Sequence, residues 1–245
     1  MKFFTLKQAF FFFGLCFAFL PLFSCAARID GTLAADGSAA LSVSVSLEQQ
    51  MASLVQRLSA AGGQGGGSVL DGLSIAHSLV AAPGVSAASL RNTGPSAIEG
   101  QVRISAIGDF LAAADGRAAG GRGFIEFVQS GTGGRCLINI SRENGPVIIG
   151  LLSPQIADFL NVLMAPLATG EELSRTEYLE LIASFYNRAI CDEIAGSRIR
   201  ASIDFPGAVT SVRGGTFSGR RVNFDIPLVD LLVLETPLSY EVNWL

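Results

Sequence analysis

The sequence predicts an α+β domain in which an antiparallel sheet of hairpins carries paired helices on one face, following an N-terminal export signal. Three observations support this fold class. Runs of alternating apolar and polar residues are joined by short glycine-containing turns, stretches with helical apolar spacing lie between these runs, and a continuous apolar stretch opens the chain. Hairpin strands with helices inserted between them are typical of α+β folds with an antiparallel sheet.

The opening stretch has the layout of an export signal. Lys2 and Lys7 form a basic start, and an apolar run over residues 9–20 follows them. This run is short for a membrane span, since a spanning helix needs about 20 apolar residues. We therefore expect the segment to direct export and then to be removed.

The end of this signal resembles the lipobox of bacterial lipoproteins. It reads Leu22-Phe23-Ser24-Cys25, and Phe23 replaces the usual small or aliphatic residue, a relaxed form similar to that of spirochaetes. The resemblance implies cleavage after residue 24 and a diacylglyceryl group on the Cys25 thiol, often with acylation of the new amine. The alternative is an ordinary secretory signal that is cut near Ala26.

Acylation of Cys25 would make the membrane the first partner of this protein. Each buried methylene of an acyl chain contributes about 0.8 kcal/mol, so several chains hold a protein at a bilayer. We expect a location on the exported side of the cell membrane or of an outer membrane. The predicted organisation is a cleaved signal over residues 1–24, a lipidated tether over 25–28 and one domain over 29–245.

A hairpin is expected directly after the anchor. Arg28–Leu33 and Ala39–Leu47 flank a turn that contains Gly37, and the second run alternates between apolar residues and serine or alanine. Only Ala26 and Ala27 separate this hairpin from the anchor, a reach of about 10 Å at about 3.5 Å per residue. The domain is therefore expected to lie against the bilayer surface.

The remaining elements follow from apolar spacing and from capping residues. Strands are expected over residues 85–90, 98–104, 124–129, 135–141, 198–205, 208–213, 221–225 and 239–244. Helices are expected over residues 48–60 and 69–79, from Pro154 to Pro166, from Ser174 to Gly196, and for a short turn at Pro227. The helix after Ser174 is expected to be the longest, with Phe185 and Ala189 facing inward. The first and last strands are expected to share one sheet.

Charge and composition exclude several classes of function. The mature chain of 221 residues has 15 arginines, no lysine and 21 acidic residues, a formal charge of about −6. An acidic surface argues against nucleic acid as a partner. The absence of lysine excludes Schiff-base chemistry and the lysine of a nucleotide-binding P-loop.

The inventory of catalytic and metal-binding side chains is small. His77 is the single histidine, and no Gly-x-Ser-x-Gly motif accompanies it, so we expect a partly buried helix residue rather than a catalytic base. One histidine and two distant cysteines provide no ligand-spaced pair for zinc. The glycine runs at 62–67 and 120–123 are expected to be loops rather than phosphate-binding sites. We expect no metal and no cofactor.

Cysteines and late carboxylates leave two questions open. Cys136 and Cys191 either form one disulfide in an oxidising envelope or remain buried free thiols. Asp225, Asp230 and Glu235 are the candidate residues for an acidic hydrolase site, but a catalytic pair needs a defined separation that the sequence does not supply.

The two ends of the domain resemble LppM-type bacterial lipoproteins. The resemblance rests on the hairpin residues Ile29-Asp30-Gly31 and Asp36-Gly37-Ser38, and on the late segments Phe205–Ser211 and Arg221–Pro227. It implies a lipid-binding or envelope-interaction role and supplies no catalytic residues.

We therefore expect a non-enzymatic lipoprotein that binds an apolar ligand or an envelope partner. Helix stripes and an alternating sheet can enclose an apolar cavity, although they can also form a packed core. A scaffold that acts through protein contacts and a hydrolase that uses acidic residues are the alternatives.

Overall fold

The computed structural model describes residues 26–61, 70–114, 124–145, 160–161 and 163–245. The expected signal peptide and Cys25 lie outside the described residues. So do both glycine runs singled out in the sequence, and most of the helix expected after Pro154. Leu160 and Leu163 from the end of that segment are described, and both are buried.

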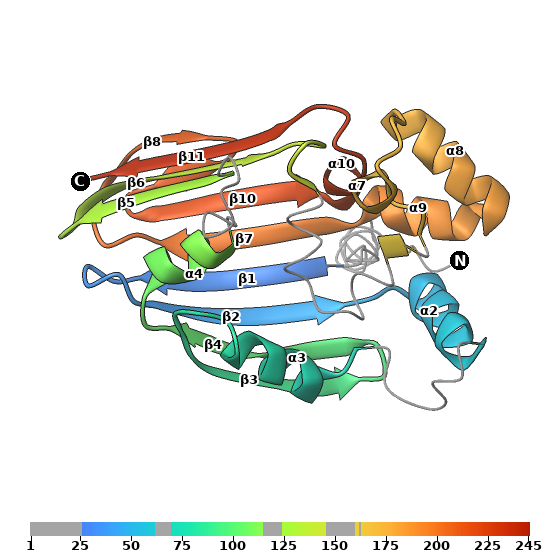
Figure 1. Cartoon of the computed structure of the whole chain (residues 1–245), viewed down its shortest axis with the longest axis horizontal. Coiled ribbons are helices and arrows are strands. Elements are labelled where there is room, and N and C mark those ends of the chain that lie inside the picture. The colour runs from blue at the N-terminus through green and yellow to red at the C-terminus, as the bar shows by residue number, and fades with distance from the viewer. Residues whose placement is uncertain (1–25, 62–69, 115–123, 146–159, 162) are drawn as a thin grey trace, which may run out of the picture.

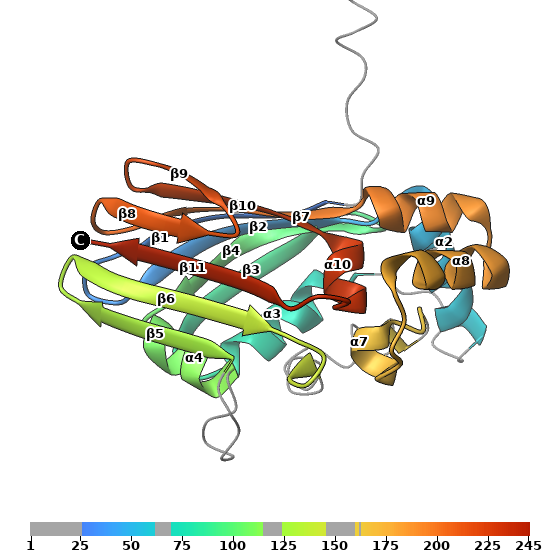
Figure 2. The same cartoon turned by 90° about the horizontal axis from the view of Figure 1, so that it is seen from above.

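The fold is α+β, as the sequence predicts, but its strands form two sheets instead of one (Figure 1). The larger sheet has the order β3-β4-β2-β1-β7-β10-β9, with bounds Val85–Gly94, Ala97–Ile104, Ala39–Ser46, Ala26–Leu33, Arg198–Asp204, Arg221–Pro227 and Thr216–Ser218. The smaller sheet has the order β5-β6-β11-β8, with bounds Ile125–Ser130, Gly133–Ile140, Leu238–Trp244 and Val209–Arg213. The two sheets lie one above the other as layers (Figure 2).

The opening hairpin forms as expected and occupies the centre of the larger sheet. Strand β1 pairs antiparallel with β2, and Gly37 in the connecting turn has a φ of 81°, which glycine adopts without steric cost. On its other side β1 pairs in parallel with β7. This parallel pair was not expected, because it joins segments about 170 residues apart, and no local pattern records such a pairing.

The first and last strands lie in different sheets, so the expectation that they share one is wrong. Strand β11 pairs with β6 and β8. The chain leaves β10 through the short helix α10 (Leu228–Val233), where Leu234 at its end has a φ of 49°. This tight left-handed end sends the chain into the second layer instead of returning it to the first.

Most of the helices gather at one end or at one edge of the larger sheet, whereas the helix that follows β4 lies beside β5 of the smaller sheet (Figures 1 and 2). Their bounds are Gln49–Ala61 for α2, Gly72–Val80 for α3, Ile107–Ala114 for α4, Pro166–Thr169 for α7, Arg175–Phe185 for α8 and Arg188–Gly196 for α9. Helix α3 packs along β3 and β4, whereas α2, α8 and α9 gather at the end of the sheet where β1 begins.

The single long helix expected after Ser174 is two helices. Ser174 and Glu177 form the expected capping box, but α8 ends at Phe185, and α9 begins after Asn187. The Asn187 side chain accepts a hydrogen bond from the Ile190 backbone amide at 2.9 Å and so caps α9. Because the helix breaks here, Phe185 is 65% exposed and Ala189 is also exposed, contrary to the expected inward face.

Two main cores hold this arrangement together. One lies between the sheets at the end far from α2, α8 and α9, where Trp244 of β11 packs on Phe205 with ring centroids 4.8 Å apart. The other joins α2, α8, α9 and α10 around Tyr178 and Ile182, which are fully buried. A small third cluster fixes α3 on β3 and β4.

The segment Phe205–Ser211, which contains Pro206 and Gly207, has a structural role. The backbone of Ala208 exchanges two hydrogen bonds with that of Leu245, each 3.0 Å long. A Cβ on Gly207 would lie 1.7 Å from the Leu245 carbonyl oxygen, so glycine is required by this close approach of two backbones. Among the described residues, no helix has both the length and the apolar character needed to cross a bilayer.

Candidate apolar binding site between the sheets

Each sheet has an apolar inner face and a polar outer face. In β1 the odd positions Ala27, Ile29, Gly31 and Leu33 point toward the second sheet, and the even positions point to solvent, because side chains alternate along a strand. The burial of Leu33 in the core between the sheets fixes which face is the inner one. The smaller sheet follows the same rule, since Val242 and Cys136 belong to that core.

Between the two main cores the inner faces are only half buried. We call this region the inner apolar strip. It consists of Ala27 and Ile29 of β1, Ile199 and Ala201 of β7, Ile226 of β10, Ile138 and Ile140 of β6, and Leu238 and Tyr240 of β11. None of these residues is a member of the clusters formed by the described residues. The strip is therefore apolar surface that the described part of the chain covers incompletely.

A ring contact places the two halves of the strip opposite each other. Phe224 of the larger sheet meets Tyr240 of the smaller one edge to face, with centroids 5.5 Å apart and an interplanar angle of 87°. Phe224 shares a rung with Ala201, and Tyr240 shares one with Ile138. Burial also raises the pKa of the Tyr240 hydroxyl, which therefore stays protonated and can donate a hydrogen bond.

The strip begins directly beside the predicted anchor. Ala26, the residue after Cys25, is already the first residue of β1 and pairs with Ser46 on one side and Arg198 on the other. The tether expected over residues 25–28 therefore contains strand residues, because Ala26, Ala27 and Arg28 belong to the sheet. The next residue, Ala27, and then Ile29 are members of the strip.

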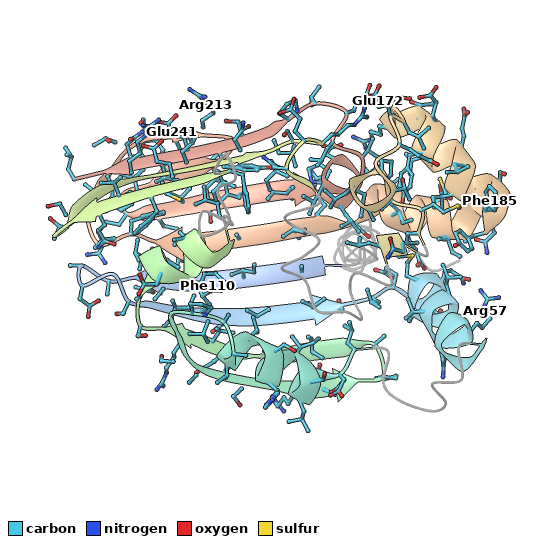
Figure 3. The ribbon with its side chains drawn as sticks, in the orientation of Figure 1. Arg57, Phe110, Glu172, Phe185, Arg213 and Glu241 are labelled. Atoms are coloured by element: carbon cyan, nitrogen blue, oxygen red, sulfur yellow. The ribbon has the colours of Figure 1, made fainter. Side chains whose placement is uncertain are left out.

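Charged side chains are directed to the outer faces. Figure 3 shows Glu241 and Arg213 together on the outward side of β11 and β8, and their charged groups lie 3.5 Å apart. Arg135 also donates a hydrogen bond to Glu241 at 3.1 Å. On the larger sheet, Arg221 and Asp204 form an ion pair with a shortest distance of 2.6 Å. The residues of the strip themselves carry no charge, and the charge that acts on one of them is that of Asp230, because burial together with Asp230 raises the pKa of Tyr240.

Cys136 and Cys191 are free thiols in the structure. Cys136 packs against the core between the sheets, whereas Cys191 lies in the helical core, so of the two alternatives the structure has the free thiols. Burial raises the pKa of the Cys136 thiol to about 11 and also raises that of Cys191. Both are protonated at neutral pH, which makes them poor nucleophiles and poor metal ligands.

The structure does not assemble the remaining candidate residues into a catalytic site. His77 is exposed on α3, so the expectation of partial burial is wrong. The hydroxyl of the neighbouring Ser78 donates a hydrogen bond to the Ser74 backbone carbonyl at 3.1 Å and not to His77. Asp225 pairs with Arg198 at 2.8 Å on the larger sheet. Within the described residues, no cluster of three or more His, Cys, Asp or Glu side chains is arranged to hold a metal ion.

The other two late carboxylates, Asp230 and Glu235, accept hydrogen bonds from Arg175, the first residue of α8. Asp230 accepts a hydrogen bond from the Arg175 guanidinium at 3.1 Å, and Glu235 accepts one from the Arg175 backbone amide at 2.8 Å. Both bonds join the start of α8 to the segment that contains α10. These two carboxylates are therefore structural partners of one arginine.

The sequence matches no protein-family model and no curated protein. Among solved structures, the chain is similar to the folded domain of LppM from Mycobacterium tuberculosis, determined by NMR, with 11% identity over 92% of this chain and 93% of that chain, and a TM-score of 0.39. A TM-score of 0.39 does not establish a common fold.

Proposed function

We propose that this protein is a non-enzymatic, lipid-anchored envelope protein that binds an acyl chain of a membrane lipid in the inner apolar strip. The observation that carries the proposal is the position of the strip. Two of its residues, Ala27 and Ile29, belong to the strand that begins immediately after Cys25. Acylation of Cys25 would place this end of the strip at the bilayer surface, where acyl chains are available.

The chemistry of the strip supports an apolar ligand. Its members are aliphatic apart from Tyr240, whose hydroxyl is the one polar group, and sites for apolar ligands commonly combine apolar walls with a few polar groups. Burying apolar surface contributes about 25 cal/mol per Å², so an acyl chain that covers half-buried isoleucines gains free energy. The proposal thus attributes the lipid-binding role expected from the sequence to the residues of the inner apolar strip.

Photocrosslinking in membranes tests this proposal. The processed protein is reconstituted through its own anchor into vesicles that contain phosphatidylglycerol with a diazirine at the end of one acyl chain. After irradiation, we expect labelled peptides that contain Ile138, Ile140 or Leu238. These residues lie on the smaller sheet, which does not include the anchored strand.

A matched pair of variants separates a specific site from general contact with lipid. Ala201→Phe fills the strip with a side chain that competes with an acyl chain for the same space, so labelling of the smaller sheet should fall by about tenfold, which corresponds to about 1.4 kcal/mol of binding free energy. Ala40→Phe adds the same side chain to the exposed outer face of β2 and should leave labelling unchanged. If the protein floats with the vesicles but its smaller sheet is never labelled, the ligand proposal is wrong. Reproducible crosslinks to another envelope protein would favour the scaffold alternative.

A further inference from the structure

Three arginines gather on the outer face of the larger sheet beside the predicted anchor. Arg198 is the register partner of Ala26, and Arg200 is the register partner of Arg28. All three occupy even-numbered positions of their strands, so they lie on the outer face, within the first three rungs of β1. Arg28 is two residues from Ala26, about 7 Å along the strand.

Nearby carboxylates neutralise this group only in part. The Arg28 guanidinium donates to Asp30 at 2.7 Å, and the Arg198 guanidinium donates to Asp225 at 2.8 Å. Arg200 lies 3.8 Å from the same Asp225 oxygen, beyond hydrogen-bonding distance. Three arginines thus share two carboxylates, which gives a local positive charge on a mature chain whose formal charge is negative.

A depression with further hydrogen-bond donors surrounds Arg28 and Arg200. It has a volume of about 440 Å³, and its lining also includes Ser202, Asn223, the Asp225 carboxylate and the turn at Gly214 and Gly215. The Ser202 hydroxyl donates to the Asn223 side-chain oxygen at 2.8 Å, so the amide nitrogen is the donor atom that Asn223 contributes to the lining. Two guanidinium groups beside an amide donor form a recognition pattern for phosphate.

We propose that this depression binds the phosphate of an anionic membrane lipid. The inference rests on the proposed anchoring at Cys25, because that anchor would hold Arg28 and Arg200 at the level of the lipid headgroups. Anionic headgroups attract arginines near a membrane surface. The acyl-chain strip and the phosphate site then lie on opposite faces of the same strand end, with Ala27 facing inward and Arg28 outward.

Arginine modification on the intact lipoprotein tests this site residue by residue. The processed protein is placed either in phosphatidylglycerol vesicles or in dodecyl maltoside micelles, which contain no phosphate. Phenylglyoxal then modifies accessible guanidinium groups, and cleavage after glutamate followed by mass spectrometry gives the rate at each arginine. In the vesicles we expect modification of Arg28 and Arg200 to slow by about fivefold each, the factor that one arginine gains near an anionic surface.

The same molecules contain matched controls. Arg103 lies on the same outer face, on the rung of Thr32, about 13 Å along β1 from Arg28, and Arg220 lies beyond that rung in the turn before β10. Both should react at the same rate in the vesicles and in micelles. A third sample, micelles with inorganic phosphate, identifies the source of the ligand.

Each possible outcome either supports or refutes the lipid phosphate site. Slower modification of Arg28 and Arg200 in vesicles, with Arg103 unchanged, supports a lipid phosphate site. Unchanged rates at Arg28 and Arg200 on protein that floats with the vesicles refute this site and leave the anchoring intact. If Arg103 is protected as strongly as Arg28 and Arg200, the bilayer shields the whole face, and a specific lipid site is refuted. If only inorganic phosphate protects Arg28 and Arg200, the depression binds a free anion, and a lipid site is again refuted. Failure of the protein to float refutes the anchoring, and with it this inference.

Discussion

At the scale of single residues, ion pairs on the outer faces are the main electrostatic feature. Glu241 illustrates them, because its carboxylate accepts hydrogen bonds from Asn243 and Arg135 and lies near Arg213. The bond from Asn243, together with the charges of Arg135 and Arg213, lowers the pKa of Glu241. Such exposed pairs contribute little each and act mainly by keeping the face polar.

The lowered pKa of Glu241 predicts a pH dependence with a defined sign. The unfolded chain has a glutamate pKa of 4.5, and the folded value is lower. The contribution of Glu241 to the free energy of unfolding is therefore complete above about pH 4.5 and is lost as the pH falls through the folded value. Urea unfolding at neutral and acid pH should show that wild type loses more stability on acidification than Glu241→Gln.

A control glutamate makes this comparison specific. Glu180 is exposed on α8 and lies outside the sheets, so Glu180→Gln should retain the acid sensitivity of wild type. An identical loss of stability on acidification in wild type and Glu241→Gln would contradict the interpretation of Glu241.

Local residue patterns predicted turns and helix caps well, but they predicted less well which side chains are exposed. Asp36 and Gly37 form the expected turn, since a turn depends on neighbouring residues only, and the Asp36 side chain accepts the Ser38 amide at 2.9 Å. His77 and Phe185 are exposed contrary to expectation. Whether such side chains are covered depends on elements far away in the chain, which a helical period does not record.

At the scale of elements, one asparagine divides the helical region. Without the cap at Asn187, the apolar spacing from Tyr178 onward is compatible with one continuous helix. The break lets α9 turn back so that Ile190 and Ile194 reach the same core as Tyr178. Glu193 of α9 then accepts the backbone amides of Gln50 and Met51 and caps α2.

Removal of the cap at Asn187 should weaken this region measurably. We expect Asn187→Ala to lower the free energy of unfolding by about 1 kcal/mol, the usual contribution of an N-cap side chain. Ser184→Ala, an exposed substitution one turn earlier on α8, should change it by less than about 0.5 kcal/mol. Equal stability of the two variants in urea unfolding would show that Asn187 does not define the helix start.

Most element boundaries could be predicted, because hairpins and capping boxes are encoded within a few residues. Their assignment to sheets could not. Strand β1 pairs with β7, and β11 joins the second sheet, through contacts between distant segments. The three-residue strand β9 was also missed, since Thr216–Ser218 is too short for an alternation to be recognised.

At the scale of the whole molecule, the predicted anchor at Cys25 directly precedes β1, the central strand of the larger sheet. The sequence predicted an acylated Cys25 and an apolar ligand, but it named no ligand-binding residues. The strip could not be found from the sequence, because its two halves come from β1, β7 and β10 on one sheet and from β6 and β11 on the other. In β7, Ile199 and Ala201 alternate with Arg198 and Arg200, and this alternation indicates that one side of the strand is apolar and faces inward. The alternation does not indicate which residues of the other sheet lie opposite that side.

The strip and the arginines together predict a domain that engages lipid with both faces of one strand end. The absence of linker residues between Cys25 and β1 would hold that end at the bilayer. The core at Trp244 and Phe205 lies at the opposite end of the sheets, away from this contact.

The mass of the mature chain tests the central claim most directly. We predict that the protein extracted from membranes begins at Cys25 and that its N-terminal peptide carries the added mass of a diacylglyceryl group, with palmitate among its acyl chains. A mature chain that begins at another residue, or an N-terminal Cys25 with a free thiol, would contradict the account.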